Sequence, residues 1–409
     1  MRVLRPFPTY LVAYPPTAGL ALWVSMLCGC ASPARTPSEL LGSRTNFRHE
    51  VRTLNTGALP ATALLPPAPI GAELTGAEVT LEGPPARVAA FTEALMSWNL
   101  ILPPGTGVRC EIRVGREREG EPSAIEWTPW LFVGTAGDVP LPRASVQSFT
   151  FDDGTRAKVE IDAVVLSAPA QHVQWRVAAV RGRFVAGLSG AVDHGLGSPV
   201  VLSRLALCTT REEGDVAIPA AVAIDPAAVR ELAVPFRSQV TEDPRIAGRV
   251  CSPTSVAMAL AFARARSADP EVPPPSDPGR PVMDVCTRAY DAHFDLFGNW
   301  PRNIQAAFEL GEPGWLMRIS DWPEAHAFIA RGIPLIASIR AKPGELRGAP
   351  YDGTDGHLIV IVGFTREGDA IVLDPAVETA GRARRIYRHE DLERVWFEGS
   401  AGTTYVIGL

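Results

Sequence analysis

Residues 71–215 are built from short apolar runs in which hydrophobic and polar residues partly alternate, and this pattern constrains the fold most. Alternation with a period of two is typical of strands, whose successive side chains point to opposite faces. Gly, Pro and Asp separate the runs, as in turns. The pattern predicts an all-β domain arranged as an antiparallel sandwich or jelly roll. The runs are AEVTLEG, GVRCEIRVG, WLFVGTA, SFTFDDG, AKVEIDAVVLS, HVQWRVAAVRG and PVVLSRLALC.

Four tryptophans lie in this β-rich region: Trp98, Trp127, Trp130 and Trp175. Large aromatic side chains fill the cores of sandwiches, and exposed ones stack on sugars. Both roles stay open from the sequence, so the β domain is a candidate for contacts with a glycan or a protein. The region carries no calcium-loop or zinc-ligand spacing.

The pattern changes after a connector at residues 216–232. Residues 233–409 begin with helical stripes and continue with apolar strand-like runs, which predicts an α+β domain. Its first helix is expected from Pro253 to Arg266, within the stretch CSPTSVAMALAFARAR. The later strands are expected in IPLIASIR, HLIVIVGF, AIVLDP and TTYVIGL.

The first 30 residues resemble an export signal. Arg2 and Arg5 precede an apolar run that ends in small residues and is too short to span a bilayer comfortably. Its end, LCGC, resembles a bacterial lipobox, which predicts that Cys30 is lipidated; a plain secretory peptide is the alternative. We therefore interpret residues 1–30 as a signal peptide and the Pro-rich residues 31–70 as a tether. An exported protein anchored to the cell envelope, or secreted, is expected.

Composition argues against nucleic acid as a partner. The formal net charge is −6, whereas a nucleic-acid footprint needs clustered positive charge. The sequence contains no H-E-x-x-H and no C-x-x-C motif, so we expect no catalytic metal and no cofactor.

Cys251 opens the predicted helix. A thiol at a helix N-terminus lies near unpaired backbone N–H groups and the positive end of the helix dipole. Both favour the thiolate and lower the thiol pKa, as a nucleophile requires. The alternative is a structural cysteine, and a disulfide between Cys251 and Cys286 is the competing explanation. Cys110 and Cys208 both lie in the β-rich region and are a candidate disulfide pair, although connectivity cannot be read from the sequence.

His357 and Asp374 flank a predicted hairpin. His357 begins an apolar run, TREGD supplies the turn, and AIVLDP returns alongside. A turn at Arg366–Glu367 places Asp374 opposite Ile359 and diagonal to His357, within reach of its imidazole. A carboxylate there fixes the tautomer of the ring, as the third member of a triad does.

Four motifs in this order, VPFRSQ, CSPTSVAMAL, GHLIVIVGF and VLDPA, resemble those of C39-like cysteine peptidases, which have a papain-like fold. The resemblance covers residues 233–409. It implies that Cys251 is the nucleophile, His357 the general base and Asp374 the orienting acid. It also implies that Gln239 donates to the oxyanion.

Two features depart from the family pattern. Ser252 stands where the family usually has Gly, and the segment between Gln239 and Cys251 is longer than expected. The chain also carries no G-x-x-x-x-G-K-[ST] phosphate loop, so leader processing by an ABC exporter is not supported.

These observations predict an exported thiol hydrolase that cleaves peptide or related amide bonds in a peptide or protein substrate. A catalytically silent papain-like protein that binds peptides or glycans is one alternative. An acyltransferase that uses the same cysteine is another. The aromatic segment HFDLFGNWPRN, His293–Asn303, is a candidate lining of the substrate cleft, with core packing as the other interpretation.

Overall fold

The computed structural model describes residues 40–55, 73–74, 78–118, 120–137, 147–181, 184–185, 191–192, 200–240, 243–267 and 280–408. The predicted signal peptide, Cys30 and part of the predicted tether lie outside these residues. None of the described helices is long and apolar enough to cross a membrane.

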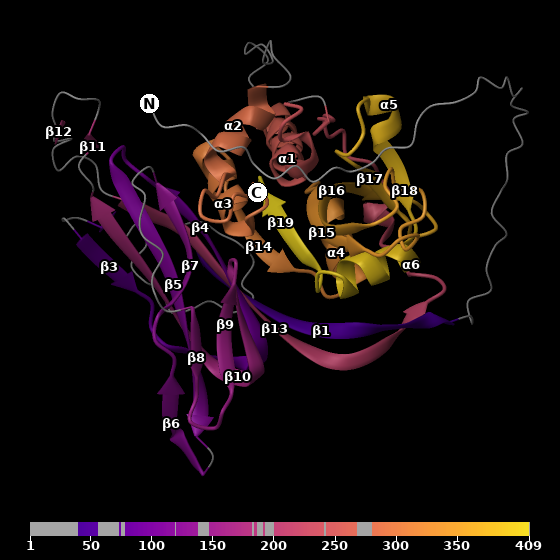
Figure 1. The fold of residues 1–409 in the computed structure, drawn as a ribbon. Coiled ribbons are helices and arrows are strands. Elements are labelled where there is room, and N and C mark those ends of the chain that lie inside the picture. Colours follow the sequence, from indigo (N-terminus) through magenta and orange to yellow (C-terminus); the bar gives the residue numbers. More distant parts are fainter. Residues whose placement is uncertain are drawn as a thin grey trace, which may run out of the picture. The chain divides into compact units, whose positions relative to one another are not determined.

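The N-terminal region forms an 11-stranded antiparallel sheet (Figure 1). Its main path runs β1-β13-β4-β10-β5-β6, and the other strands pair with members of that path or with each other. A separate two-stranded sheet contains β11 and β12. The strands are β1 Leu40–Asn55, β2 Glu73–Leu74, β3 Glu78–Glu82, β4 Ala86–Ile101, β5 Thr106–Arg118, β6 Glu121–Trp127, β7 Leu131–Gly137, β8 Ser148–Thr150, β9 Arg156–Glu160, β10 Ala163–Arg181, β11 Phe184–Val185, β12 Ala191–Val192 and β13 Val200–Pro219.

The β-rich prediction for this region is confirmed. Some strands are longer than the sequence suggests, and most of them belong to one connected sheet. Strand β10 spans 19 residues and merges two of the expected runs. It pairs with β4 through Ala163–Val173 and with β5 through His172–Arg181. Register shifts between Val165 and His172 accompany the change of partner. The expected sandwich is therefore a single connected sheet with its own apolar core.

Residues 40–55 correct the tether prediction, because they form β1 and pair with β13 along its length. The side chain of Arg44 is 7% exposed and forms an ion pair with Glu393. Its guanidinium also lies 5.0 Å from the centre of the Phe397 ring. A polar, weakly alternating strand of this kind is stabilised by its partner strand, which composition does not reveal.

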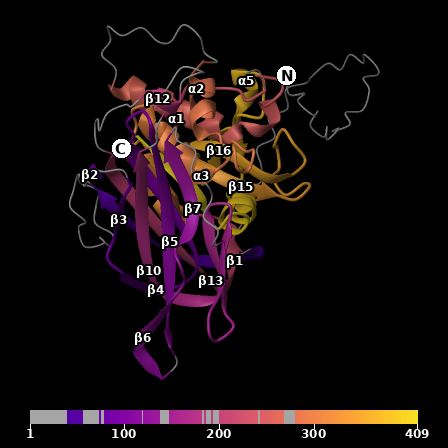
Figure 2. The ribbon, with the colours of Figure 1, turned by 60° about the vertical axis from the view of Figure 1, so that its left-hand side comes forward.

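The C-terminal region is α+β, as predicted, with a six-stranded antiparallel sheet in the order β14-β19-β15-β16-β17-β18 (Figures 1 and 2). Its strands are β14 Gly314–Arg318, β15 Leu335–Ala341, β16 Thr354–Phe364, β17 Ala370–Leu373, β18 Arg384–Tyr387 and β19 Thr403–Ile407. Its helices are α1 Cys251–Ser267, α2 Arg280–Ala289, α3 Trp300–Glu309, α4 Trp322–Ala330, α5 Ala380–Ala383 and α6 His389–Leu392. Short 3₁₀ turns are η1 Pro226–Ala228 and η2 Ala247–Arg249, and η3 Glu393–Glu398 is a π-helix.

Helix α1 begins at Cys251, two residues before the expected start, because the N–H of Thr254 already donates to the carbonyl of Val250 at 3.0 Å. Pro253 fits in this first turn, where its missing N–H costs no helical hydrogen bond. Residues 252–260 are buried, and α1 packs against β16. This packing brings the N-terminus of α1 to the strand that carries His357.

The two sheets meet where β4 contacts α3 and β14. The side chain of Gln305 exchanges hydrogen bonds with the backbone of Leu100, each 2.8 Å long. The N–H of Leu316 donates to Ser97 Oγ at 3.0 Å. An ion pair between Arg318 and Glu93 joins the same elements.

Candidate active site

Cys251, His357 and Asp374 form a continuous chain of contacts. The thiol of Cys251, partly buried at the start of α1, lies close enough to the imidazole of His357 in β16 for each group to shift the pKa of the other. His357 Nε2 lies 2.9 Å from Asp374 Oδ1. Because Nε2 faces the carboxylate, Nδ1 is the ring nitrogen left for the sulfur. His357 is 5% exposed and Asp374 is fully buried, so little water separates the three groups.

The hairpin that joins His357 to Asp374 forms, but its turn centres on Glu367, because Phe364 pairs with Ala370, and a register shift between Ile361 and Gly363 then restores the predicted pairing. Val360 pairs with Leu373, and continuing this register places Asp374 opposite Ile359. His357 therefore lies diagonally across from Asp374, where side chains reach each other.

Charge interactions overcome the effect of burial at this site. Burial opposes ionisation of Cys251, but the hydrogen bond and charge of His357 hold the thiol pKa below its ordinary value. Burial alone would lower the pKa of His357, yet the Asp374 carboxylate and the Cys251 sulfur raise it to about 10. The same imidazolium outweighs burial at Asp374 and lowers the pKa of that carboxyl. The arrangement favours a thiolate–imidazolium pair backed by a carboxylate.

Two tyrosines that the sequence analysis did not identify bind the second oxygen of Asp374. Tyr351 Oη donates to Asp374 Oδ2 at 3.0 Å, and Tyr387 Oη donates to it at 2.8 Å. The N–H of Ala376 donates to Oδ1 at 2.9 Å. The Tyr351 ring also meets the His357 ring edge-on, with centroids 5.0 Å apart. Both phenols keep Asp374 ionised and oriented, since hydrogen bonds to a carboxylate favour its charged form.

Polar contacts fix α1 against β16 beside the thiol. A backbone hydrogen bond from Leu358 helps to lower the pKa of Cys251, and Ser255 Oγ donates to the Leu358 carbonyl at 3.2 Å. Ser252, which replaces the usual glycine, is fully buried, and its Oγ lies 2.8 Å from Tyr405 Oη. The buried hydroxyls of Ser252 and Tyr405 therefore satisfy each other, whereas a glycine at position 252 would leave the Tyr405 hydroxyl without this partner.

Gln239 lies beside the turn that follows Asp374. Its N–H donates to the Pro375 carbonyl at 3.0 Å. Ser238 Oγ donates to the Val377 carbonyl at 2.6 Å and anchors the same segment. The side-chain Oε1 of Gln239 is buried and makes no hydrogen bond with the residues that the structure describes. The backbone of Gln239 is thus held beside the residue that follows Asp374, and its Oε1 has no partner among the described residues.

The candidate disulfide between Cys110 and Cys208 is not formed in this structure, where each is a buried free thiol. Cys110 packs in the core of the N-terminal sheet, whereas Cys208 packs in a separate cluster with Leu95 and Ala163. Cys251 is also a free thiol, which excludes a Cys251–Cys286 bond in this structure.

The four tryptophans of the β-rich region fall into a buried pair and a partly exposed pair. Trp98 and Trp175 are 1% exposed and fill the core of the N-terminal sheet. Trp127 and Trp130 are partly exposed, and the guanidinium of Arg113 lies 4.8 Å from the centre of each ring. These two rings are therefore partly covered by a cation rather than open for stacking.

The segment His293–Asn303 is mostly structural. Phe297 and Trp300 pack on the C-terminal core, and Asn303 donates to the carbonyls of Phe297 and Asn299 at 2.7 and 2.8 Å. In the described part of the chain, no cluster of three His, Cys, Asp or Glu side chains is arranged to hold a metal ion.

Comparison with known families gives one match. Residues 231–401 match the model of the Peptidase_C39 like family, a span that includes Gln239, Cys251, His357 and Asp374. A search among curated proteins found no match to this chain.

Proposed function

We propose that the chain is a thiol-dependent hydrolase of peptide or related amide bonds, on the premise that residues 231–401 match the model of the Peptidase_C39 like family. The observation that carries the proposal is the continuous contact from Cys251 through His357 to Asp374. We also propose a papain-like arrangement for this region, supported by a cysteine at a helix N-terminus packed on an antiparallel sheet that carries the histidine.

The proposed reaction begins with attack of the Cys251 thiolate on the substrate carbonyl carbon. A C–S bond forms, and the carbonyl electron pair moves to oxygen. The imidazolium of His357 then protonates the leaving amine as the C–N bond breaks, which leaves an acyl-enzyme. His357, now neutral, removes a proton from water, and the hydroxide displaces Cys251 to release the acid. Asp374 holds the ring and stabilises its charged form.

The oxyanion is the charge that this site must stabilise. The backbone N–H of Cys251 and the side-chain amide of Gln239 are the proposed donors. The position of Gln239 beside Pro375 supports this role, as does its buried amide without a protein partner for Oε1. The two ends of an amide are interchangeable by rotation, which would present Nε2 to the substrate.

The location of the protein stays a prediction from the N-terminal sequence. We propose export with a lipid anchor on Cys30, on the basis of the apolar run and the LCGC sequence. A peptide or protein substrate outside the cytoplasm is the partner that fits this location.

The direct test is hydrolysis of a peptide and amide library by the mature protein. Cys251→Ala is expected to reduce kcat by about 10³-fold or more, because the nucleophile is lost. Cys208→Ala, which removes a buried thiol of the other sheet, is the matched control and should retain activity. Equal turnover by Cys251→Ala and the wild type would refute the proposal. Aminolysis products in place of acids would assign the same thiol to acyl transfer.

A further inference from the structure

The loop between β15 and β16, residues 342–353, carries one of the two phenols that bind Asp374. Tyr351 lies near its end, six residues before His357 in the chain. The side chain of Tyr351 contacts both the carboxylate and the imidazole of the proposed triad. The position of this loop therefore bears directly on the orientation of both groups.

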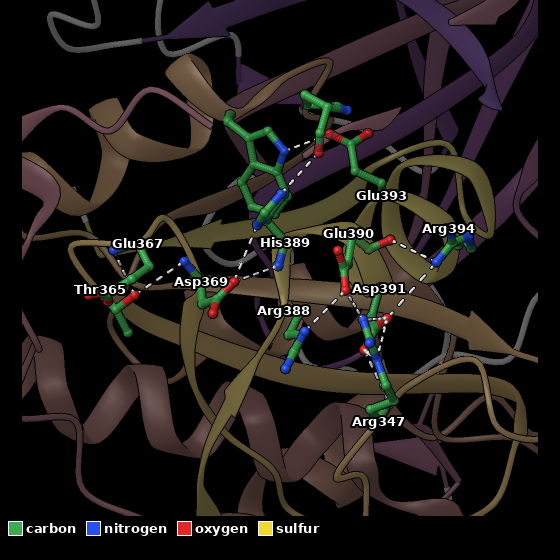
Figure 3. Close-up of polar contacts among 12 residues, drawn as sticks. Arg347, Thr365, Glu367, Asp369, Arg388, His389, Glu390, Asp391, Glu393 and Arg394 are labelled. Atoms are coloured by element: carbon green, nitrogen blue, oxygen red, sulfur yellow. Dashed lines mark hydrogen bonds and ion pairs between the residues drawn. The ribbon is translucent and has the colours of Figure 1, made fainter. Parts of the chain in front are cut away.

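Arg347 ties the middle of this loop to α6 (Figure 3). Its Nη2 lies 2.7 Å from Asp391 Oδ1, and its Nε lies 3.0 Å from Asp391 Oδ2. The backbone N–H of Arg347 donates to Asp391 Oδ2 at 3.2 Å. The guanidinium also forms an ion pair with Glu390. This is a forked, charge-assisted contact with backbone support, a geometry specific to arginine.

The two acids that receive Arg347 are both buried. Asp391 is 2% exposed and Glu390 is 3% exposed. Arg394 approaches Asp391 only to 4.0 Å, and Arg388 approaches Glu390 to 3.5 Å. Removing Arg347 leaves a buried carboxylate without its closest cation, which is costly in a protein interior. The loop and α6 are therefore held together by charge.

A second contact holds the same loop against β18. Arg385, in β18, donates to the Gly348 carbonyl. Strand β18 also carries Tyr387, the other phenol on Asp374. The loop is thus tied to α6 through Arg347, to β18 through Gly348 and to Asp374 through Tyr351.

We propose that Arg347 is a positioning residue of the active site: its ion pair with Asp391 and Glu390 holds the 342–353 loop so that Tyr351 fixes Asp374, and through it His357. This inference rests on the proposed hydrolase function. Arg347 touches no member of the triad, so its effect travels only through the loop and Tyr351.

The test compares Arg347→Ala with Arg388→Ala. Both changes remove a cation from Glu390, but among the described residues Arg388 forms no hydrogen bond or ion pair with the loop, so it is the matched control. The readouts are kcat and KM for a peptide substrate, and the rate of Cys251 alkylation by iodoacetamide as a function of pH. Arg347→Ala is expected to lower kcat by about 10-fold and KM by less than 2-fold, as for loss of an interaction that serves the transition state. The pH midpoint of alkylation should rise, because a poorly held Asp374 supports the imidazolium less.

Tyr351→Phe gives an independent check, because it keeps the ring and the loop but removes the hydroxyl. It should reproduce the shift in the alkylation midpoint, and the Arg347→Ala/Tyr351→Phe double variant should add little further change. Arg347→Lys keeps the charge without the fork and should fall between the wild type and Arg347→Ala; it replaces the alanine variant if that variant does not fold.

The outcomes separate this inference from the proposed function. If Arg347→Ala and Arg388→Ala have equal kcat values and equal alkylation profiles, Arg347 is not a positioning residue. Fully additive effects of Arg347→Ala and Tyr351→Phe would also overturn the inference. If instead wild-type hydrolysis survives Cys251→Ala, the proposed function itself fails, whatever Arg347 does.

Discussion

The N-terminal sheet and the C-terminal site contain the same reactive residue type in opposite electrostatic surroundings. Burial in the sheet core raises the pKa of the Cys110 thiol, and burial raises that of Cys208 to about 11. Cys251 is also shielded from water, yet its pKa lies below the ordinary thiol value because His357 contacts it. Burial alone therefore disfavours the thiolate, whereas burial beside an imidazolium favours it.

The buried acids of the two regions show the same contrast. Asp162, in the turn before β10, accepts a 2.9 Å hydrogen bond from the N–H of Trp300, but burial dominates and raises its pKa to about 7. Asp374 is at least as buried, yet its pKa is lowered by the His357 charge and by several donors. The difference lies in the opposite charge and in the number of donors that each carboxylate receives.

The sharpest test of this contrast is the relative alkylation of the cysteines in the native protein. At pH 7 a thiol with a pKa near 11 is about 10⁻⁴ thiolate, so we expect Cys251 to react at least about 10³-fold faster than Cys110 and Cys208. Mass spectrometry after brief treatment with iodoacetamide measures the rates. Denatured protein, in which the thiols should react alike, is the control. Similar rates in the native state would contradict the comparison.

A second test removes the charge of Asp374. Asp374→Asn should lower kcat by about 10²–10⁴-fold, because the imidazolium loses its counter-ion and the ring its tautomer. Since Asp374 helps to raise the pKa of His357 to about 10, the alkaline limb of the activity profile should move to lower pH.

The matched control for this variant is Asp369→Asn. Asp369 belongs to the same hairpin but lies 3.3 Å from the ring of His389 instead of His357. We expect kcat/KM and its pH profile to stay near the wild type. An Asp374→Asn enzyme with an unchanged alkaline limb would show that Asp374 does not set the protonation of His357.

The sequence was informative where local spacing decides the structure. The residues TREGD and the apolar runs on either side predict the hairpin, but the register that brings Asp374 diagonal to His357 also depends on a shift between Ile361 and Gly363 that the sequence does not signal. The stripe of α1 and its N-terminal Pro placed Cys251 at a helix start. These features depend on short-range geometry, which the spacing of hydrophobic residues in the sequence indicates directly.

The rest of the site depends on contacts between distant segments. Tyr351 lies in a loop without periodicity, and Tyr387 ends the short strand RRIY. Neither tyrosine has a local signal that points to Asp374. Strand β1 could not be predicted for the same reason, because its polar sequence forms a strand only by pairing with β13.

The smallest expected effect comes from the weakly supported acid, Asp162. Its pKa is near 3.8 in an unfolded chain and about 7 in the fold, so the unfolded state loses its proton first. The free energy of unfolding therefore falls as pH rises from about 4 to 7, and above pH 7 the full cost of burying the ionised Asp162 carboxylate has been reached.

Asp162→Asn keeps an acceptor for the Trp300 N–H but removes the charge. It should raise the free energy of unfolding by on the order of 1–3 kcal/mol at pH 8 and change it little at pH 4. Urea unfolding at the two pH values measures this difference, with kcat expected to stay unchanged. Equal effects at both pH values would show that the Asp162 carboxyl is not held neutral by burial, and would remove the contrast with Asp374.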